Sequence, residues 1–131
     1  MSTRSLGRMG EESAALYLAE HGCTVLARNA YLGHLEVDII ARSDTHLIFA
    51  EVKTRRARPG VRSRYGRPAD AVDMTKRTRL MQAVQLWRRQ NPGVYDALIP
   101  NIDIIEVYID PSCAEYRVLE IRHYRNAVNG N

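Results

Sequence analysis

Apolar residues recur at helical spacing in two segments of the chain. The first segment runs from residue 6 to about residue 21, with Ser5 as a suitable N-cap and Gly22 as a suitable terminator. Its apolar stripe consists of Leu6, Met9, Ala14, Tyr17 and Leu18. The second segment covers residues 69–90 and is ended by Asn91-Pro92-Gly93. Its clearest apolar stripe consists of Leu80, Ala83, Val84 and Trp87. The stripe predicts that Trp87 belongs to the core.

Between and after these helices, runs of β-branched and aromatic residues predict strands. The strands are expected at residues 24–27, 36–42, 47–54, 102–109 and 116–124. The second and third flank the polar tip Ser43-Asp44-Thr45-His46, which predicts a hairpin. The order of elements predicts one α/β domain over residues 1–131, with a mixed central sheet and helices packed on it.

Composition excludes several classes of protein. The chain has 131 residues, 45% of them hydrophobic, which is enough for one core without disulfides. Cys23 and Cys113 form no zinc pattern and no disulfide framework. No apolar run reaches the ~20 residues of a membrane span, and the first residues lack a signal peptide. We therefore expect a cytoplasmic protein without a membrane partner.

The hairpin is where the sequence predicts chemistry. If its turn centres on Asp44-Thr45, the numbers of paired residues sum to 89, so Asp38 faces Glu51 and Glu36 faces Lys53. Because side chains alternate along strands, these four share one face. The opposite face receives an apolar layer of Val37, Ile39, Ala41, Ile48, Ala50 and Val52.

Two facing carboxylates repel each other, and a divalent cation between them would remove that cost. Mg²⁺ prefers oxygen ligands and usually takes one or two protein carboxylates, which Asp38 and Glu51 could supply with the backbone carbonyl of Val52. Lys53 could orient or deprotonate the attacking water, or neutralise charge on a phosphate. The implied reaction is hydrolysis of a phosphodiester. Alternatively, Lys53 and Glu36 form an ordinary ion pair, and a register slip of one residue would separate the carboxylates.

Several short motifs lie between about Gly7 and Trp87. They are Gly10-Glu11, Arg28-Asn29, Glu36-Val37-Asp38-Ile39-Ile40-Ala41, Phe49-Ala50-Glu51-Val52-Lys53-Thr54-Arg55 and the spacing of Lys76, Leu80, Ala83 and Trp87. In these motifs the sequence resembles the YraN family. That family belongs to the restriction-endonuclease-like, PD-(D/E)XK superfamily and is similar to archaeal Holliday-junction resolvases.

The resemblance implies a restriction-endonuclease-like fold and a nuclease site that uses Mg²⁺ or Mn²⁺, with Asp38, Glu51 and Lys53 as its catalytic core. It also implies that Glu11, on the first helix, is a metal ligand, although Arg8 or Lys53 could pair with it instead. The chain departs from the family in having Leu35 before the first acid, where Gly is usual. It also has Asn101-Ile102-Asp103 in place of Arg-Phe-Asp, so Asp103 is expected to support the fold rather than catalysis.

Basic residues crowd the segment after the second hairpin strand, and the net charge of +4 is concentrated there. We expect a flexible loop at about residues 55–68. The expected nucleic-acid-binding residues are Arg55, Arg56, Arg58, Arg62, Arg64, Tyr65, Arg67, Lys76 and Arg79. A solvated loop without a partner is the alternative. His34, His46 and His123 show no ligand spacing and are expected at the surface or in loops.

Three functions remain open from the sequence. The first is a metal-dependent endonuclease acting on DNA, with structured or branched DNA as a substrate and no nucleotide cofactor. The second is a non-catalytic nucleic-acid-binding module of the same fold, acting in DNA processing or recombination. The third is a structural domain with incidental carboxylates. Branched DNA has two-fold symmetry, which makes a homodimer a hypothesis.

Overall fold

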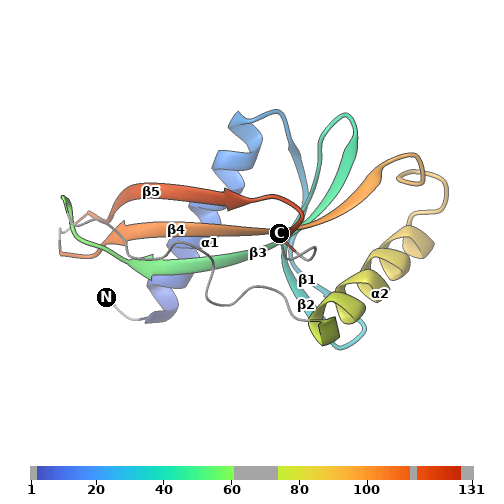
Figure 1. Cartoon of the computed structure of the whole chain (residues 1–131), viewed down its shortest axis with the longest axis horizontal. Helices are drawn as coiled ribbons and strands as arrows, with labels where there is room; N and C mark the ends of the chain where they lie inside the picture. The colour runs from blue at the N-terminus through green and yellow to red at the C-terminus, as the bar shows by residue number, and fades with distance from the viewer. Residues whose placement is uncertain (1–2, 61–73, 113–114, 128–131) are drawn as a thin grey trace.

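The computed structural model describes residues 3–60, 74–112 and 115–127. Helix α1 (Thr3–Glu20) is followed by strands β1 (Thr24–Leu32), β2 (Leu35–Arg42) and β3 (His46–Arg56). Helix α2 (Met74–Gln90) then precedes β4 (Ile99–Asp110) and β5 (Arg117–Tyr124), as Figure 1 shows. The five strands form one sheet in the order β1-β2-β3-β4-β5. Only β3 and β4 pair in parallel, so the predicted mixed sheet flanked by helices is confirmed.

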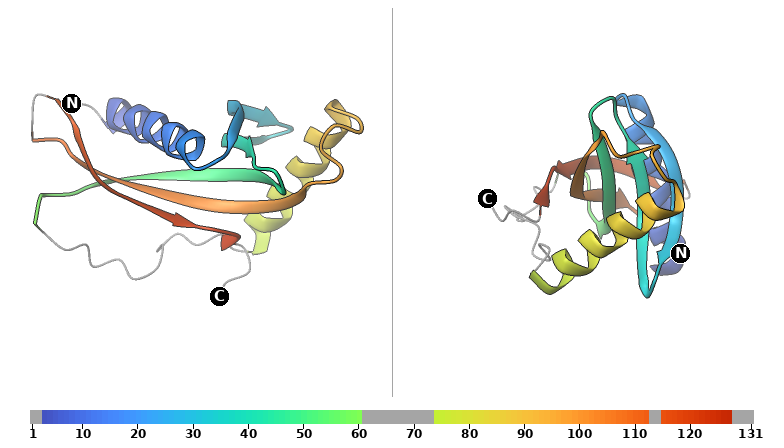
Figure 2. Two further views of the ribbon diagram at one scale, coloured as in Figure 1. Left: turned by 90° about the horizontal axis from the view of Figure 1, so that it is seen from above. Right: turned by 90° about the vertical axis from the view of Figure 1, so that its right-hand side faces the viewer.

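The two helices cover opposite faces of the sheet, which Figure 2 shows from above. On one face α1 packs Leu6, Ala14 and Leu18 against the strands. On the other face α2 packs Leu80, Ala83 and Val84 in the same way, as its stripe predicted. Burying both faces needs apolar residues at successive positions, and β3 and β4 supply them.

The ends of the elements differ from the predictions in detail. Gly22 has φ +83° and follows the last turn of α1, where the Cys23 N–H donates to the Leu18 carbonyl. Ser5 lies inside α1 rather than at its N-cap. Strands β1 and β4 are longer than expected, because residues that look polar or irregular in sequence continue the pairing. No helix in the described ranges is long and apolar enough to cross a membrane.

The hairpin of β2 and β3 has the predicted register only near its turn. Paired numbers sum to 89 from Arg42–Leu47 to Ile39–Ala50, and the pairing ends there. Beyond that point β2 continues with β1 while β3 continues with β4, so the sheet forks (Figure 1). The predicted pairings of Asp38 with Glu51 and of Glu36 with Lys53 are therefore wrong, because the two strands have separated.

The apolar layer of the hairpin is confirmed except at Val37. Five of its members pack in the cluster under α1, whereas Val37 packs in the cluster under α2. Strand β1 pairs with β2 on both sides of Asp38 but not at Asp38 itself, and the facing Asn29 has φ +50°. This irregularity turns β2, so that Ile39 packs in the cluster under α1 and Val37 in the cluster under α2.

Candidate functional site

Asp38 lies where β2 leaves β3. Its Oδ2 accepts a hydrogen bond of 2.8 Å from the backbone N–H of Val52. The pairing of β2 with β3 ends at Ala50. The Asp38 carboxylate therefore accepts the hydrogen bond that a backbone carbonyl of β2 would accept if the pairing continued. The bond fixes the orientation of the side chain, and among the described residues Oδ1 accepts no hydrogen bond. The backbone of Val52, expected near the metal, is therefore next to the Asp38 carboxylate.

The pKa of Asp38 is raised from its ordinary value of 3.8 to about 6. Burial is the main cause, because a half-buried carboxylate loses water around its charged form. The negative charges of Glu11, Glu51 and Glu36 add to the rise, while the Val52 N–H opposes it. Three carboxyl groups, one each from α1, β2 and β3, therefore lie within electrostatic range of Asp38.

Glu11 reaches this cluster because α1 approaches β3 closely at the preceding residue. A Cβ on Gly10 would lie 1.9 Å from Oγ1 of Thr54, far inside contact distance. Glycine at this position lets the helix lie against the strand and brings Glu11 towards Asp38. In the part of the chain that is described, neither Arg8 nor Lys53 pairs with Glu11, whereas Arg28 pairs with its neighbour Glu12 at 2.7 Å.

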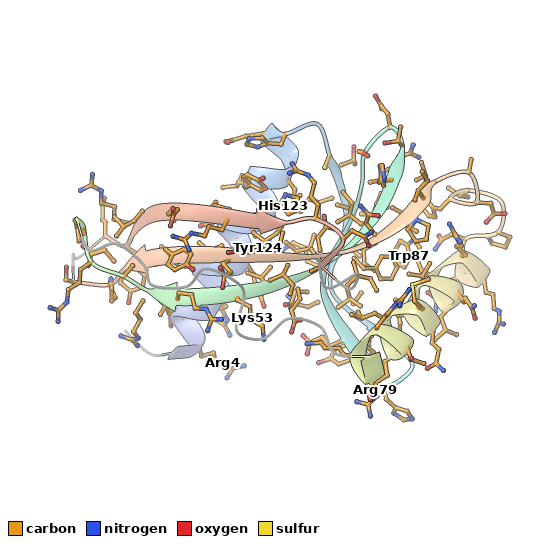
Figure 3. All side chains as sticks on the ribbon, viewed as in Figure 1. Arg4, Lys53, Arg79, Trp87, His123 and Tyr124 are labelled. Carbon is orange, nitrogen blue, oxygen red and sulfur yellow. The ribbon has the colours of Figure 1, made fainter. Side chains whose placement is uncertain are left out.

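Glu51 lies between two lysines. Its Oε1 is 3.3 Å from Nζ of Lys53 on the same strand and also pairs with Nζ of Lys76 on α2. The first contact confirms that Glu51 and Lys53 share a face of β3. Lys53 is labelled on this strand in Figure 3. The second contact was not predicted, because the position of α2 over the fork is a tertiary feature. The other oxygen, Oε2, is buried and has no hydrogen-bond partner among the described residues.

The arrangement has the donors that a hard divalent cation needs. Glu51 has a buried carboxylate oxygen without a partner among the described residues, and its charge adds to the crowding that raises the pKa of Asp38. A cation bound near both carboxylates would satisfy that oxygen and relieve the repulsion. Within the described ranges, no three His, Cys, Asp or Glu side chains converge closely enough to hold a metal by themselves. Mg²⁺ retains several waters and needs one or two protein carboxylates, so the residues present fit that ion.

A second polar group lies further along the same face of β3. Arg55 pairs with Glu106 of β4 at 3.5 Å, and Glu106 also accepts a hydrogen bond of 3.0 Å from the hydroxyl of Tyr108. Glu106 is fully buried. The pKa of Tyr124 on β5 is raised, first by the burial of Tyr124 itself and then by the neighbouring negative charge of Glu106. Arg55 therefore lies in a strand with a protein partner, which differs from its predicted place in a loop. The sequence did not predict a role for Glu106, because it is a single charged residue in an otherwise apolar run within β4.

The remaining predicted basic residues divide into two groups. Arg56 ends β3 and Arg58 follows it, and both are exposed. Arg79 is exposed on α2, one turn beyond Lys76. The rest of the predicted binding residues, Arg62, Arg64, Tyr65 and Arg67, lie outside the described residues, as does the greater part of the expected loop.

His123 was predicted at the surface or in a loop, but it lies in β5 and its side chain is only 7% exposed. Its Nε2 is 2.7 Å from Oδ2 of Asp103, and its Nδ1 is 3.0 Å from the Tyr17 hydroxyl. Asp103 is 1% exposed and also accepts the backbone N–H of Asn126. These contacts tie β5 to β4 and to α1, in agreement with the expectation that Asp103 supports the fold.

The sequence of this chain is similar to those of known proteins along most of its length. A model for "Uncharacterised protein family UPF0102" matches residues 10–107, which include Glu11, Asp38, Glu51 and Lys53. A UPF0102 protein of Caldicellulosiruptor saccharolyticus is 33% identical over 127 residues, which cover 97% of this chain and 99% of that protein. A UPF0102 protein of Oleidesulfovibrio alaskensis is 49% identical over 85 residues, 65% of this chain but only 40% of that longer protein.

Among solved structures, that of Pyrococcus furiosus SfsA in complex with Ca²⁺ is similar over 92% of this chain and 64% of that chain. The identity is 16% and the TM-score 0.40, which is too low to establish a shared fold. The sequence matches are much stronger, since the family model covers residues 10–107 and the Caldicellulosiruptor saccharolyticus protein is 33% identical over 97% of this chain. On that basis the chain belongs to the UPF0102 family.

Proposed function

We propose that this protein is a metal-dependent endonuclease of the PD-(D/E)XK type that hydrolyses phosphodiester bonds in DNA. The observation that carries the proposal is the pair of carboxylates at the fork. Asp38 is held by the Val52 N–H, and Glu51 has a buried oxygen without a partner. A nearby lysine, Lys53, completes the Asp/Glu-x-Lys arrangement of that superfamily. The resemblance to the YraN family supports the same assignment.

Asp38 and Glu51 would hold Mg²⁺ or Mn²⁺, with Glu11 as a further ligand, directly or through water. When bound, such a cation supplies Lewis-acid stabilisation of charge on phosphate oxygens and lowers the pKa of water. The Val52 N–H keeps the Asp38 carboxylate in one orientation, which reduces the reorganisation needed on binding. Lys76 neutralises the first oxygen of Glu51, which leaves the unpartnered Oε2 as the ligand atom.

Lys53 contributes a second positive charge. Its ammonium lies 3.3 Å from Glu51 and is about a quarter exposed, so it is accessible to a phosphate at the fork. There it would donate hydrogen bonds to a phosphate oxygen and stabilise the charge that builds in the transition state. Removal of such a donor typically lowers the rate by about 10²- to 10³-fold. We therefore expect Lys53→Ala to lower cleavage by about that factor.

The test compares single-stranded, duplex and four-way-junction DNA with Mg²⁺ or Mn²⁺. Wild-type protein is expected to cleave at least one of them, and Asp38→Asn is expected to abolish cleavage while retaining binding in EDTA. Asp44→Asn, an exposed aspartate in the turn of the same hairpin, is the matched control. Mg²⁺ should also raise the melting temperature of wild-type protein and not that of Asp38→Asn. If binding is seen without cleavage under every condition, the protein is a nucleic-acid-binding module instead.

A further inference from the structure

A groove opens beside the fork, between α2 and the turn that joins β1 to β2. The cavity has a volume of about 460 Å³, within the usual range for small-ligand sites. The hairpin side is lined by Leu32, His34 and Leu35, and the helix side by Arg79, Gln82 and Leu86. Gly33, with φ +63°, makes the tight turn that brings the hairpin tip towards Leu86.

Both walls of the groove belong to elements that also carry residues of the proposed active site. On α2, Arg79 lies three residues beyond Lys76, which is about 4.5 Å along the helix axis. Lys76 is the residue that pairs with Glu51. On the other wall, Leu35 precedes Asp38 by three residues, about 10 Å along the strand. A polynucleotide with one phosphate at the fork would therefore place an adjacent nucleotide in this groove.

The lining has the chemistry of a nucleotide site. Arg79 is exposed and forms no hydrogen bond or ion pair with any described residue, so its guanidinium can bind a phosphate. Leu32, Leu35 and Leu86 offer apolar surface to the face of a base. The Gln82 amide carries both a donor and an acceptor for a base edge.

We infer that this groove binds an unpaired nucleotide next to the cleaved phosphodiester. The substrate class is then DNA with a single-stranded segment at the cleavage point. A base inside a duplex is stacked on both faces and paired along its edge, so it cannot present its face to the leucines or its edge to Gln82. The inference takes its ligand class from the nuclease proposed above.

The experiment measures binding rather than cleavage. A fluorescein-labelled oligothymidylate and a duplex of the same length are titrated with protein in EDTA, and anisotropy is recorded at several salt concentrations. We expect tighter binding of the single strand. Arg79→Ala should weaken that binding about tenfold and lower the slope of log affinity against log salt by about one. Gln82→Ala should weaken binding of the single strand and leave duplex binding unchanged.

Arg89→Ala is the matched control, because Arg89 has the same charge and is exposed on the same helix outside the groove. It should change affinity far less than Arg79→Ala. Equal losses in the two variants, or preferred binding of the duplex, would overturn the inference. Groove-dependent binding by a protein that cleaves no DNA would support the groove and refute the nuclease. Arg79 forms no hydrogen bond or ion pair with a described residue, so its replacement should leave the melting temperature unchanged.

Discussion

Replacement of Asp38 by asparagine should make the metal-free protein more stable at neutral pH while removing its proposed activity. The pKa of Asp38 is about 6 in the folded protein against an ordinary value of 3.8, mainly because of burial. Folded protein therefore binds the proton more tightly than unfolded protein. The contribution of this group to stability is complete below pH 3.8 and is lost as the pH rises through about 6.

The difference is a little over two pH units, each worth about 1.4 kcal/mol, which gives an upper bound of about 3 kcal/mol. Because Asp38 is only half-buried, solvent screening reduces this to about 1–2 kcal/mol. Asparagine resembles the protonated carboxyl group and can still accept the Val52 N–H through its amide oxygen. Asp38→Asn should thus be more stable by about 1–2 kcal/mol at pH 8.

The assay is urea unfolding followed by circular dichroism in EDTA, at pH 8 and pH 4.5. By pH 4.5 the gain should fall to about a third of its value at pH 8, since folded Asp38 is then largely protonated. Asp44→Asn in the exposed turn should show no such dependence. An Asp38→Asn protein that is less stable than wild type at pH 8, or a gain that is equal at both pH values, would refute the reasoning.

Two further predictions concern packing and a buried charge, both measured by urea unfolding. Gly10→Ala should destabilise the protein by about 1–3 kcal/mol, because the added Cβ clashes with Thr54. Gly7→Ala is the control and should stabilise the protein by up to about 1 kcal/mol, because a Cβ there meets no atom within 4 Å. A stabilising Gly10→Ala would contradict the close approach of α1 to β3. Arg55→Met should cost about 3 kcal/mol because it leaves the fully buried Glu106 without its ion pair, and Glu106→Gln in the same chain should recover part of that loss. Additive losses in the double variant would argue against the pairing.

Local patterns in the chain were sufficient for much of the fold. The helical stripes of α1 and α2 are buried as their spacing predicts, because the period of a helix decides which side chains share a face. The turn at Asp44-Thr45 sets the register of β2 and β3 near it, and the alternation of side chains then puts Glu51 and Lys53 on one face. These features depend on neighbours within a few residues.

Other features depend on contacts between segments far apart in the chain. The fork at Asp38 arises because β2 follows β1 and β3 follows β4, a competition that no local pattern reveals. Lys76 meets Glu51 only because α2 packs over the fork. His123 resembles any surface histidine in sequence, yet Asp103 and Tyr17 enclose it once β5 pairs with β4. The sequence by itself determined the helices, the register of the hairpin near its turn and the identity of the acidic and basic candidates. Only the tertiary structure decided that Asp38 lies among other carboxylates, that Glu51 pairs with Lys76 and that the second oxygen of Glu51 has no described partner.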